Sequence, residues 1–81
     1  MRLRVLYFAS IREFTKLREE EVEVTEGATA ENLKRKVQEM HASLEGQESN
    51  LLVAVNGSFV EPKRILKPGD EIALFPPVSG G

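Results

Sequence analysis

The chain has 81 residues, a formal net charge of −2 and no cysteine. A chain of this length folds as one small domain with a modest core, so we expect any catalysis to come from a partner protein. The near balance of charge and the lack of a long apolar run predict a cytoplasmic protein with neither nucleic acid nor membrane as a main ligand.

Apart from Arg4, the amino-terminal segment from residue 3 to residue 8 is aliphatic and aromatic, which predicts a β-strand with apolar groups on both faces. Side chains alternate between the two faces of a strand. The alternation places Leu3, Val5 and Tyr7 on one face and Leu6 and Phe8 on the other.

A second strand is predicted from Glu21 to Val24, where glutamate and valine alternate as in a half-buried strand. The two strands are expected to form a hairpin, with residues 10–18 as its loop. The pair Arg12-Glu13 falls in this loop. Taken alone, it indicates a functional role no more strongly than it indicates a surface ion pair that contributes little to stability.

A helix is predicted after Thr29, whose hydroxyl can accept a hydrogen bond from the first helical turn. The helix is expected to have one apolar stripe, and the basic run Lys34-Arg35-Lys36 lies mostly outside it. This run predicts a solvated helix face, and the alternative is that it docks an acidic partner. We expect His41 to lie on the surface of this helix. The stripe consists of Leu33, Val37, Met40 and Leu44.

The remaining elements are predicted to be strands. The apolar run from Leu51 to Val55 indicates a covered strand, and Asn56-Gly57 indicates a tight turn into a short strand at residues 59–60. A last strand is expected from Glu71 to Phe75, after the turn at residues 68–70.

This order of elements predicts an α+β domain in which a mixed sheet carries one main helix on one face. It resembles the ubiquitin-like β-grasp, in which the first and last strands are parallel neighbours. We expect the domain to cover residues 1–76 and to be followed by a flexible carboxyl-terminal Gly-Gly tail at residues 77–81.

An exposed aromatic cluster is predicted on the face of the sheet that the helix leaves open. If Tyr7 and Leu74 face the helix, Phe8 and Phe75 point away from it, and Phe59 is placed to join them. Such a patch on so small a domain indicates a protein interface. The alternative is that some of these rings fill the core.

The final residues are suited to form an extended tail that can enter the site of a partner protein. Pro76 and Pro77 cannot donate to a sheet ladder and direct the chain away, while Gly80 and Gly81 allow close approach of another backbone or of a phosphate. The α-carboxylate of Gly81, with a pKa of roughly 3.5, is a poor electrophile until it is activated, for example as an acyl adenylate. The alternative is a disordered end.

Over essentially its whole length the chain resembles the small, sulfur-carrying subunit of molybdopterin synthase. A terminal Gly-Gly alone is common to ubiquitin-like carriers, and the longer Phe-Pro-Pro-Val-Ser-Gly-Gly ending is more specific. The resemblance rests on Val5-Leu6-Tyr7-Phe8-Ala9 with Arg12-Glu13, on Val53-Ala54-Val55-Asn56, and on Asp70-Glu71-Ile72-Ala73-Leu74-Phe75-Pro76-Pro77-Val78-Ser79-Gly80-Gly81.

The resemblance implies a non-catalytic carrier that serves as a protein cosubstrate in molybdenum cofactor biosynthesis. An adenylyltransferase of the ubiquitin-activating type would use ATP and magnesium to adenylate Gly81, and a sulfurtransferase would supply sulfur for a terminal thiocarboxylate. No cofactor or metal would belong to the carrier itself.

The implied acceptor is cyclic pyranopterin monophosphate, bound to the large catalytic subunit of a heterotetrameric synthase. The terminal sulfur would build the dithiolene of molybdopterin there. The resemblance places the tail residues Val78, Ser79, Gly80 and Gly81 inside the large subunit. It assigns the surrounding contact to Phe8, Phe59, Phe75, Pro76 and Pro77, although some relatives have an aliphatic residue at position 59.

Two further functions remain open at the level of the sequence. A sulfur carrier for thiamine synthesis or tRNA thiolation would have the same fold and the same Gly-Gly end. A ubiquitin-like modifier, joined to lysines through an isopeptide bond, would have them as well. The acceptor that takes the sulfur distinguishes the sulfur carriers from one another, and lysines that carry the carboxyl-terminal remnant of this chain would distinguish the modifier.

Overall fold

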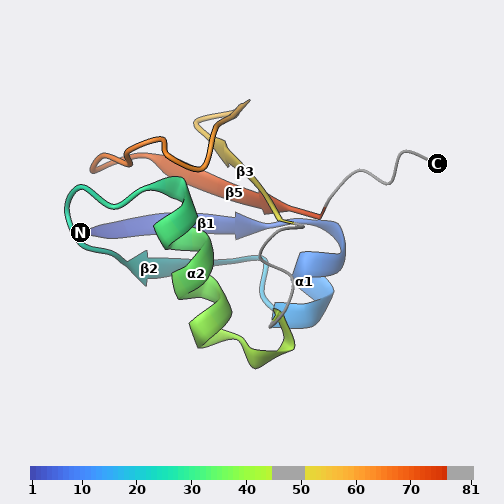
Figure 1. Cartoon of the computed structure of the whole chain (residues 1–81). Helices are drawn as coiled ribbons and strands as arrows, with labels where there is room; N and C mark the ends of the chain where they lie inside the picture. Colours follow the sequence, from blue (N-terminus) through green and yellow to red (C-terminus); the bar gives the residue numbers. More distant parts are fainter. Residues whose placement is uncertain (45–50, 77–81) are drawn as a thin grey trace.

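The computed structural model describes residues 1–44 and 51–76, which form a single sheet with helices packed against it (Figure 1). The strands are β1 (Arg2–Tyr7), β2 (Glu19–Glu23), β3 (Leu52–Val55), β4 (Ser58–Phe59) and β5 (Glu71–Phe75). The helices are α1 (Ala9–Thr15), α2 (Ala30–Met40) and a short 3₁₀ helix, η1 (Ala42–Leu44).

The sheet is mixed, with the strand order β2-β1-β5-β3-β4. Strands β1 and β5 are parallel neighbours, with Val5 opposite Ile72, and the other neighbouring strands are antiparallel. The first and last strands of the chain therefore pair inside the sheet, as the β-grasp prediction required. Neither of these strands has a free edge, and the burial of both alternates along the strand, so that only the face toward the core is fully buried.

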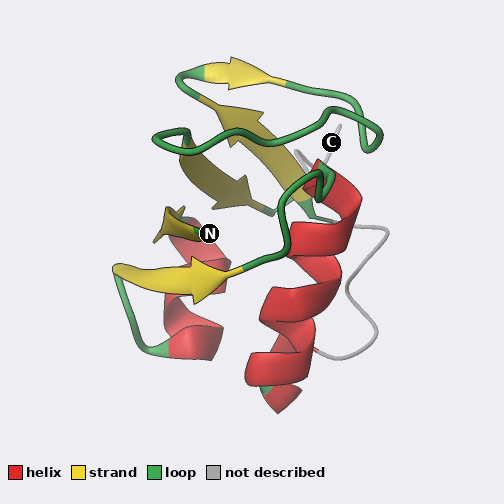
Figure 2. Ribbon diagram, turned by 90° about the vertical axis from the view of Figure 1, so that its left-hand side faces the viewer, coloured by secondary structure: helices red, strands yellow, loops and turns green. Residues whose placement is uncertain are grey.

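Helix α2 lies across one face of the sheet, as Figure 2 shows from the side. Its start is fixed by the predicted cap at Thr29: the Thr29 hydroxyl accepts from the backbone N–H of Asn32 at 3.2 Å, and the Asn32 amide oxygen accepts from the backbone N–H of Thr29 at 2.9 Å. This reciprocal pair satisfies two donors of the first turn. Leu33 and Val37 are fully buried beneath the helix.

The predicted apolar stripe of this helix is wrong at its carboxyl end. The helix stops at Met40, whose side chain is 41% exposed, and Leu44 reaches the core from η1 instead. The turn is stabilised by Gln38, whose buried amide nitrogen donates to the backbone oxygen of Leu44 at 3.2 Å. A polar residue thus lies buried at a position that the predicted apolar stripe does not include.

The covered face of the sheet and the helices enclose the core. The predicted inward residues of the two parallel strands are all buried, so this part of the sequence analysis is confirmed. The largest fully buried side chains are Leu3, Val5, Tyr7, Val22, Leu33, Val37, Leu44, Leu66, Ile72 and Leu74.

The connection between β1 and β2 contains a helix, so the prediction of a plain hairpin loop at residues 10–18 is wrong. Helix α1 has no side-chain cap at Phe8 and only one and a half to two turns, which is why its pattern is weak in the sequence. Ile11 and Thr15, four residues apart, are both buried and hold it against the core. Lys16 ends the helix in the left-handed conformation, with φ 64°.

The turn between β3 and β4 matches its prediction. Asn56 and Gly57 both have positive φ, 50° and 88°, as a two-residue hairpin turn requires. The Asn56 side chain also joins this turn to the next one, because its amide nitrogen donates to Asp70 at 2.9 Å. The short strand is β4, Ser58–Phe59, one residue earlier than the predicted pair at 59–60.

A polar cluster lies beneath the end of α2, where the sequence suggested only a surface histidine. The Tyr7 hydroxyl donates to the Glu20 carboxylate at 2.5 Å, and His41 Nε2 contacts the same oxygen. The Glu20 and His41 side chains are 18% and 17% exposed. The cluster joins β1, β2 and the end of α2, so the prediction of a surface position for His41 is wrong.

Replacing Tyr7 by Phe is expected to lower the free energy of unfolding at neutral pH by about 1 kcal/mol, because Glu20 loses a donor. Burial, and then the nearby Glu20 carboxylate, raise the pKa of Tyr7 above its ordinary value of 10.0. The resulting stabilisation is complete below that value and is lost as the pH rises through the higher pKa of the folded state. Urea unfolding at neutral and alkaline pH measures both effects.

The same residue provides a direct control for this prediction. Tyr7 is the only tyrosine and the chain has no tryptophan, so tyrosinate absorbance reports its titration without interference. Ionisation of Tyr7 at its ordinary pKa in the folded protein would contradict the account of this cluster.

Candidate partner-binding face and tail

The face of the sheet opposite α2 carries a cluster of three aromatic rings, which we call the aromatic patch: Phe8, Phe59 and Phe75. The rings of Phe8 and Phe75 are stacked, with centroids 4.6 Å apart and planes 7° from parallel. Phe59 meets Phe75 edge-on, at 5.5 Å and 62°. Pairs in these geometries stabilise by about 0.5–1.5 kcal/mol beyond the area that they bury.

Strand geometry brings these three distant residues together. Phe75 ends β5, and Phe8 follows β1, where its backbone N–H donates to the oxygen of Leu74 at 3.2 Å and extends the parallel ladder. Phe59 lies opposite Ala54, which in turn lies opposite Ala73. The predicted grouping of Phe8, Phe59 and Phe75 is therefore confirmed as a geometric fact, and their role remains a prediction.

The rings do not fill the core, which was the alternative interpretation. Phe59 is 65% exposed, and Phe8 and Phe75 are half-buried against each other. Leu52, on the strand beside β5, is 37% exposed and has Phe75 as its register partner. Complete burial of a fully exposed side chain of this kind contributes about 1.5–3 kcal/mol. A partner that covers the patch would gain the larger part of this from Phe59 and smaller parts from Phe8, Phe75 and Leu52, so the patch is suited to binding a partner.

Arg12 is a member of this site that the sequence analysis missed. Its guanidinium lies 5.9 Å from the centroid of the Phe8 ring, and its Nε donates to the backbone oxygen of Tyr7 at 3.3 Å. Helix α1 makes this possible, because it turns the chain back toward the end of β1. Arg12 thus combines a cation–π contact with a backbone anchor, in place of the suggested surface pair with Glu13.

The tail begins at the aromatic patch. Phe75 is the last residue of β5, and Pro76 follows it in a half-buried position. The other predicted tail residues, Pro77, Val78, Ser79, Gly80 and Gly81, lie outside the described residues. The patch and the exit of the chain from the sheet are therefore adjacent, so a protein that covers the patch also meets the start of the tail.

These features define a ubiquitin-like β-grasp domain with an aromatic patch on the open face of its sheet, next to the point where the last strand ends. The ThiS family model matches residues 5–81. The molybdopterin synthase sulfur carrier subunit of Chlamydomonas reinhardtii is 39% identical over 83 residues, with 100% of each chain covered. The chain belongs to the ThiS family and is similar throughout to the sulfur carrier subunits of molybdopterin synthase.

Solved structures support the same fold. The small archaeal modifier protein 1 of Haloferax volcanii has a TM-score of 0.83 and 28% identity, over 95% of this chain and 98% of its own. A chain from the complex of subunits 1 and 2 of the molybdopterin-converting factor of Helicobacter pylori 26695 has a TM-score of 0.69 and 26% identity, with 100% of both chains covered.

The expected location and ligands remain partly open. None of the helices within residues 1–44 and 51–76 is long and apolar enough to cross a bilayer. A cytoplasmic location and the expectation that nucleic acid and membranes are not partners remain predictions from composition.

Proposed function

We propose that this chain is a sulfur carrier for molybdenum cofactor biosynthesis and acts as the small subunit of a molybdopterin synthase. The observation that carries the proposal is the aromatic patch at the end of β5, directly before the Gly-Gly tail of the sequence. The full-length similarity to sulfur carrier subunits supports it. In this role the folded domain binds the partner enzymes and positions the tail for reaction.

The proposed chemistry takes place at the α-carboxylate of Gly81. The carboxylate attacks the α-phosphate of ATP on a magnesium-dependent adenylyltransferase of the ubiquitin-activating type, releasing pyrophosphate and leaving an acyl adenylate. A sulfur nucleophile derived from a sulfurtransferase then forms a bond to the carbonyl carbon, and AMP leaves. If the donor sulfur is a persulfide, the product of this step is an acyl disulfide; a thiol then attacks the donor's sulfur atom and forms a disulfide with it, and the thiocarboxylate on Gly81 leaves.

The proposed acceptor lies in a large catalytic subunit, which the aromatic patch would bind. The Helicobacter pylori relative is found in a complex of subunits 1 and 2 of its converting factor, which supports a partner of this kind. Val78, Ser79 and Gly80 would pass through a narrow channel in that subunit, because residues with small side chains allow a close approach. Phe8, Phe59, Phe75, Pro76 and Pro77 would form the contact outside it, in a heterotetramer.

A second candidate function is protein modification. The similarity to a small archaeal modifier protein favours it, because the same fold and tail are suited to joining Gly81 to a lysine amine. A sulfur carrier for thiamine or tRNA thiolation remains open for the same reason. Proteolysed cell lysates distinguish protein modification from sulfur transfer, because only the modifier function predicts lysines that carry the carboxyl-terminal remnant of this chain.

The charging step can be tested by intact-mass spectrometry after incubation with an activating enzyme, ATP, magnesium and a sulfur source. The expected mass increase equals the replacement of one oxygen atom by sulfur, located in the carboxyl-terminal fragment. Omission of ATP is the matched control and should leave the mass unchanged. An unchanged mass under conditions that charge a known carrier would count against the proposal.

A further inference from the structure

Strand β2 ends the sheet on one side and has a free edge along its length. In the antiparallel ladder with β1, Met1 and Val24 exchange both backbone hydrogen bonds, and the N–H of Tyr7 donates to the oxygen of Arg18. Bonded and non-bonded pairs alternate in such a ladder. The backbone groups of Glu21, which lies opposite Arg4 in a non-bonded pair, therefore point away from β1.

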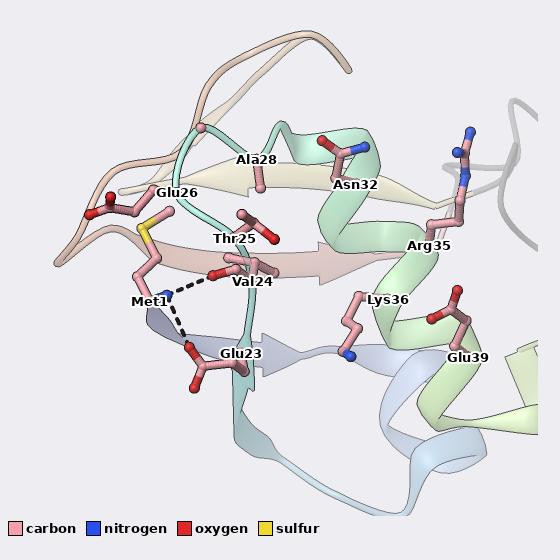
Figure 3. A pocket seen from close by; sticks show the side chains of 11 residues that line it. Met1, Glu23, Val24, Thr25, Glu26, Ala28, Asn32, Arg35, Lys36 and Glu39 are labelled. Atoms are coloured by element: carbon pink, nitrogen blue, oxygen red, sulfur yellow. Dashed lines mark hydrogen bonds and ion pairs between the residues drawn. The ribbon is translucent and has the colours of Figure 1, made fainter.

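An open groove of about 840 Å³ lies between the end of this edge and α2, as Figure 3 shows. One wall is a helical stripe formed by Asn32, Arg35, Lys36 and Glu39. The other wall continues from β2 through residues 23–28, where the apolar side chains of Val24 and Ala28 are each 8% exposed. The groove thus offers backbone hydrogen bonds on one side and room for small apolar side chains beside them.

The side chains of β2 determine which strand can occupy this edge. Its outer face carries Glu19, Glu21 and Glu23, while Val22 is buried on the other face. Arg4 and Arg2 form ion pairs with Glu19 and Glu23, but Glu21 has no ion pair within residues 1–44 and 51–76. A second copy of this edge would place glutamate opposite glutamate in every overlapping register, which is destabilising.

We propose that the free edge of β2 binds an extended, basic segment of a partner protein as an added strand. Lysine or arginine at alternate positions would lie beside Glu21 and its neighbours on the outer face, and the intervening small apolar residues would enter the groove. Main-chain hydrogen bonds supply affinity in this mode of recognition, and the alternating side chains supply specificity. This surface is distinct from the aromatic patch and does not depend on the sulfur-carrier function.

The probe is the blocked peptide Lys-Val-Lys-Val-Lys, titrated into the isotope-labelled chain and followed by amide chemical shifts. The expected result is a set of shifts at the backbone of β2 and residues 23–28. The blocked peptide Glu-Val-Glu-Val-Glu, with the same strand propensity, should bind at least about threefold more weakly, because its charges repel those of the edge. Equal binding, tighter binding of the acidic peptide, or shifts elsewhere would overturn the proposal.

Two variants separate the contributions of backbone and charge. Glu21→Lys should reverse the preference between the two peptides, whereas the same charge change at exposed Glu61, outside the groove, should not. Glu21→Pro should abolish binding of both, because it removes an N–H that the ladder with β1 does not use. If that variant fails to fold, the charge reversal decides alone, and an unchanged preference in Glu21→Lys would refute the proposal.

Discussion

Deletion of Gly81 is expected to abolish sulfur transfer by at least about a thousandfold while leaving the free energy of unfolding within about 0.5 kcal/mol of the wild type. The first effect follows because the proposed reactive group is the α-carboxylate of this residue. The second follows because Leu74 is the last member of the hydrophobic core within residues 1–44 and 51–76. Single-turnover transfer and urea unfolding measure the two effects on the same preparation.

An added residue after Gly81 provides the stricter version of this experiment. It retains every atom of the tail and moves only the carboxylate, so it should be as inactive as the deletion. Glu61→Gln, an exposed substitution outside the patch, is the matched control and should transfer sulfur normally. Normal transfer by the extended chain would show that the reaction does not use the terminal carboxylate.

Truncation of Phe75 to Ala is expected to weaken binding to the large subunit by about 30-fold or more, as for the central residues of other interfaces. Phe75 contacts both other rings of the aromatic patch, so its removal also separates Phe8 from Phe59. The same change should cost about 1–3 kcal/mol of stability, because two ring pairs of about 0.5–1.5 kcal/mol each are lost. Titration calorimetry with the isolated partner measures the change in affinity.

Phe14→Ala is the matched control for that experiment. Phe14 is a phenylalanine that is more exposed than Phe75, at 46%, but it belongs to α1 and has no ring contact with the patch. Its truncation should leave the affinity nearly unchanged. Equal losses in the two variants would mean that general apolarity, rather than the aromatic patch, determines binding.

Local patterns were sufficient to predict most of the fold. Alternation in β1 and β5, the capping residue Thr29 and the Asn56-Gly57 turn each have a short-range cause that the sequence displays directly. Helix α1 was missed because it is short and uncapped, and its stability comes from packing of Ile11 and Thr15 rather than from helix propensity.

In the candidate site, too, the residues with a local sequence signal could be predicted and those without one could not. Phe8 and Phe75 could be assigned to the open face because strand alternation fixes the side on which they lie. Arg12 could not be assigned, since its position over Phe8 depends on the turn made by α1. The contact between Glu20 and His41 joins residues 21 positions apart and has no local signal at all.

The central claim is tested most directly by a single turnover between the thiocarboxylated chain, a large synthase subunit and cyclic pyranopterin monophosphate. The account predicts that two equivalents of thiocarboxylate are consumed for each dithiolene formed, and that the chain returns to the mass of its free carboxylate. A thiocarboxylate that persists beside a competent large subunit and its substrate would contradict it.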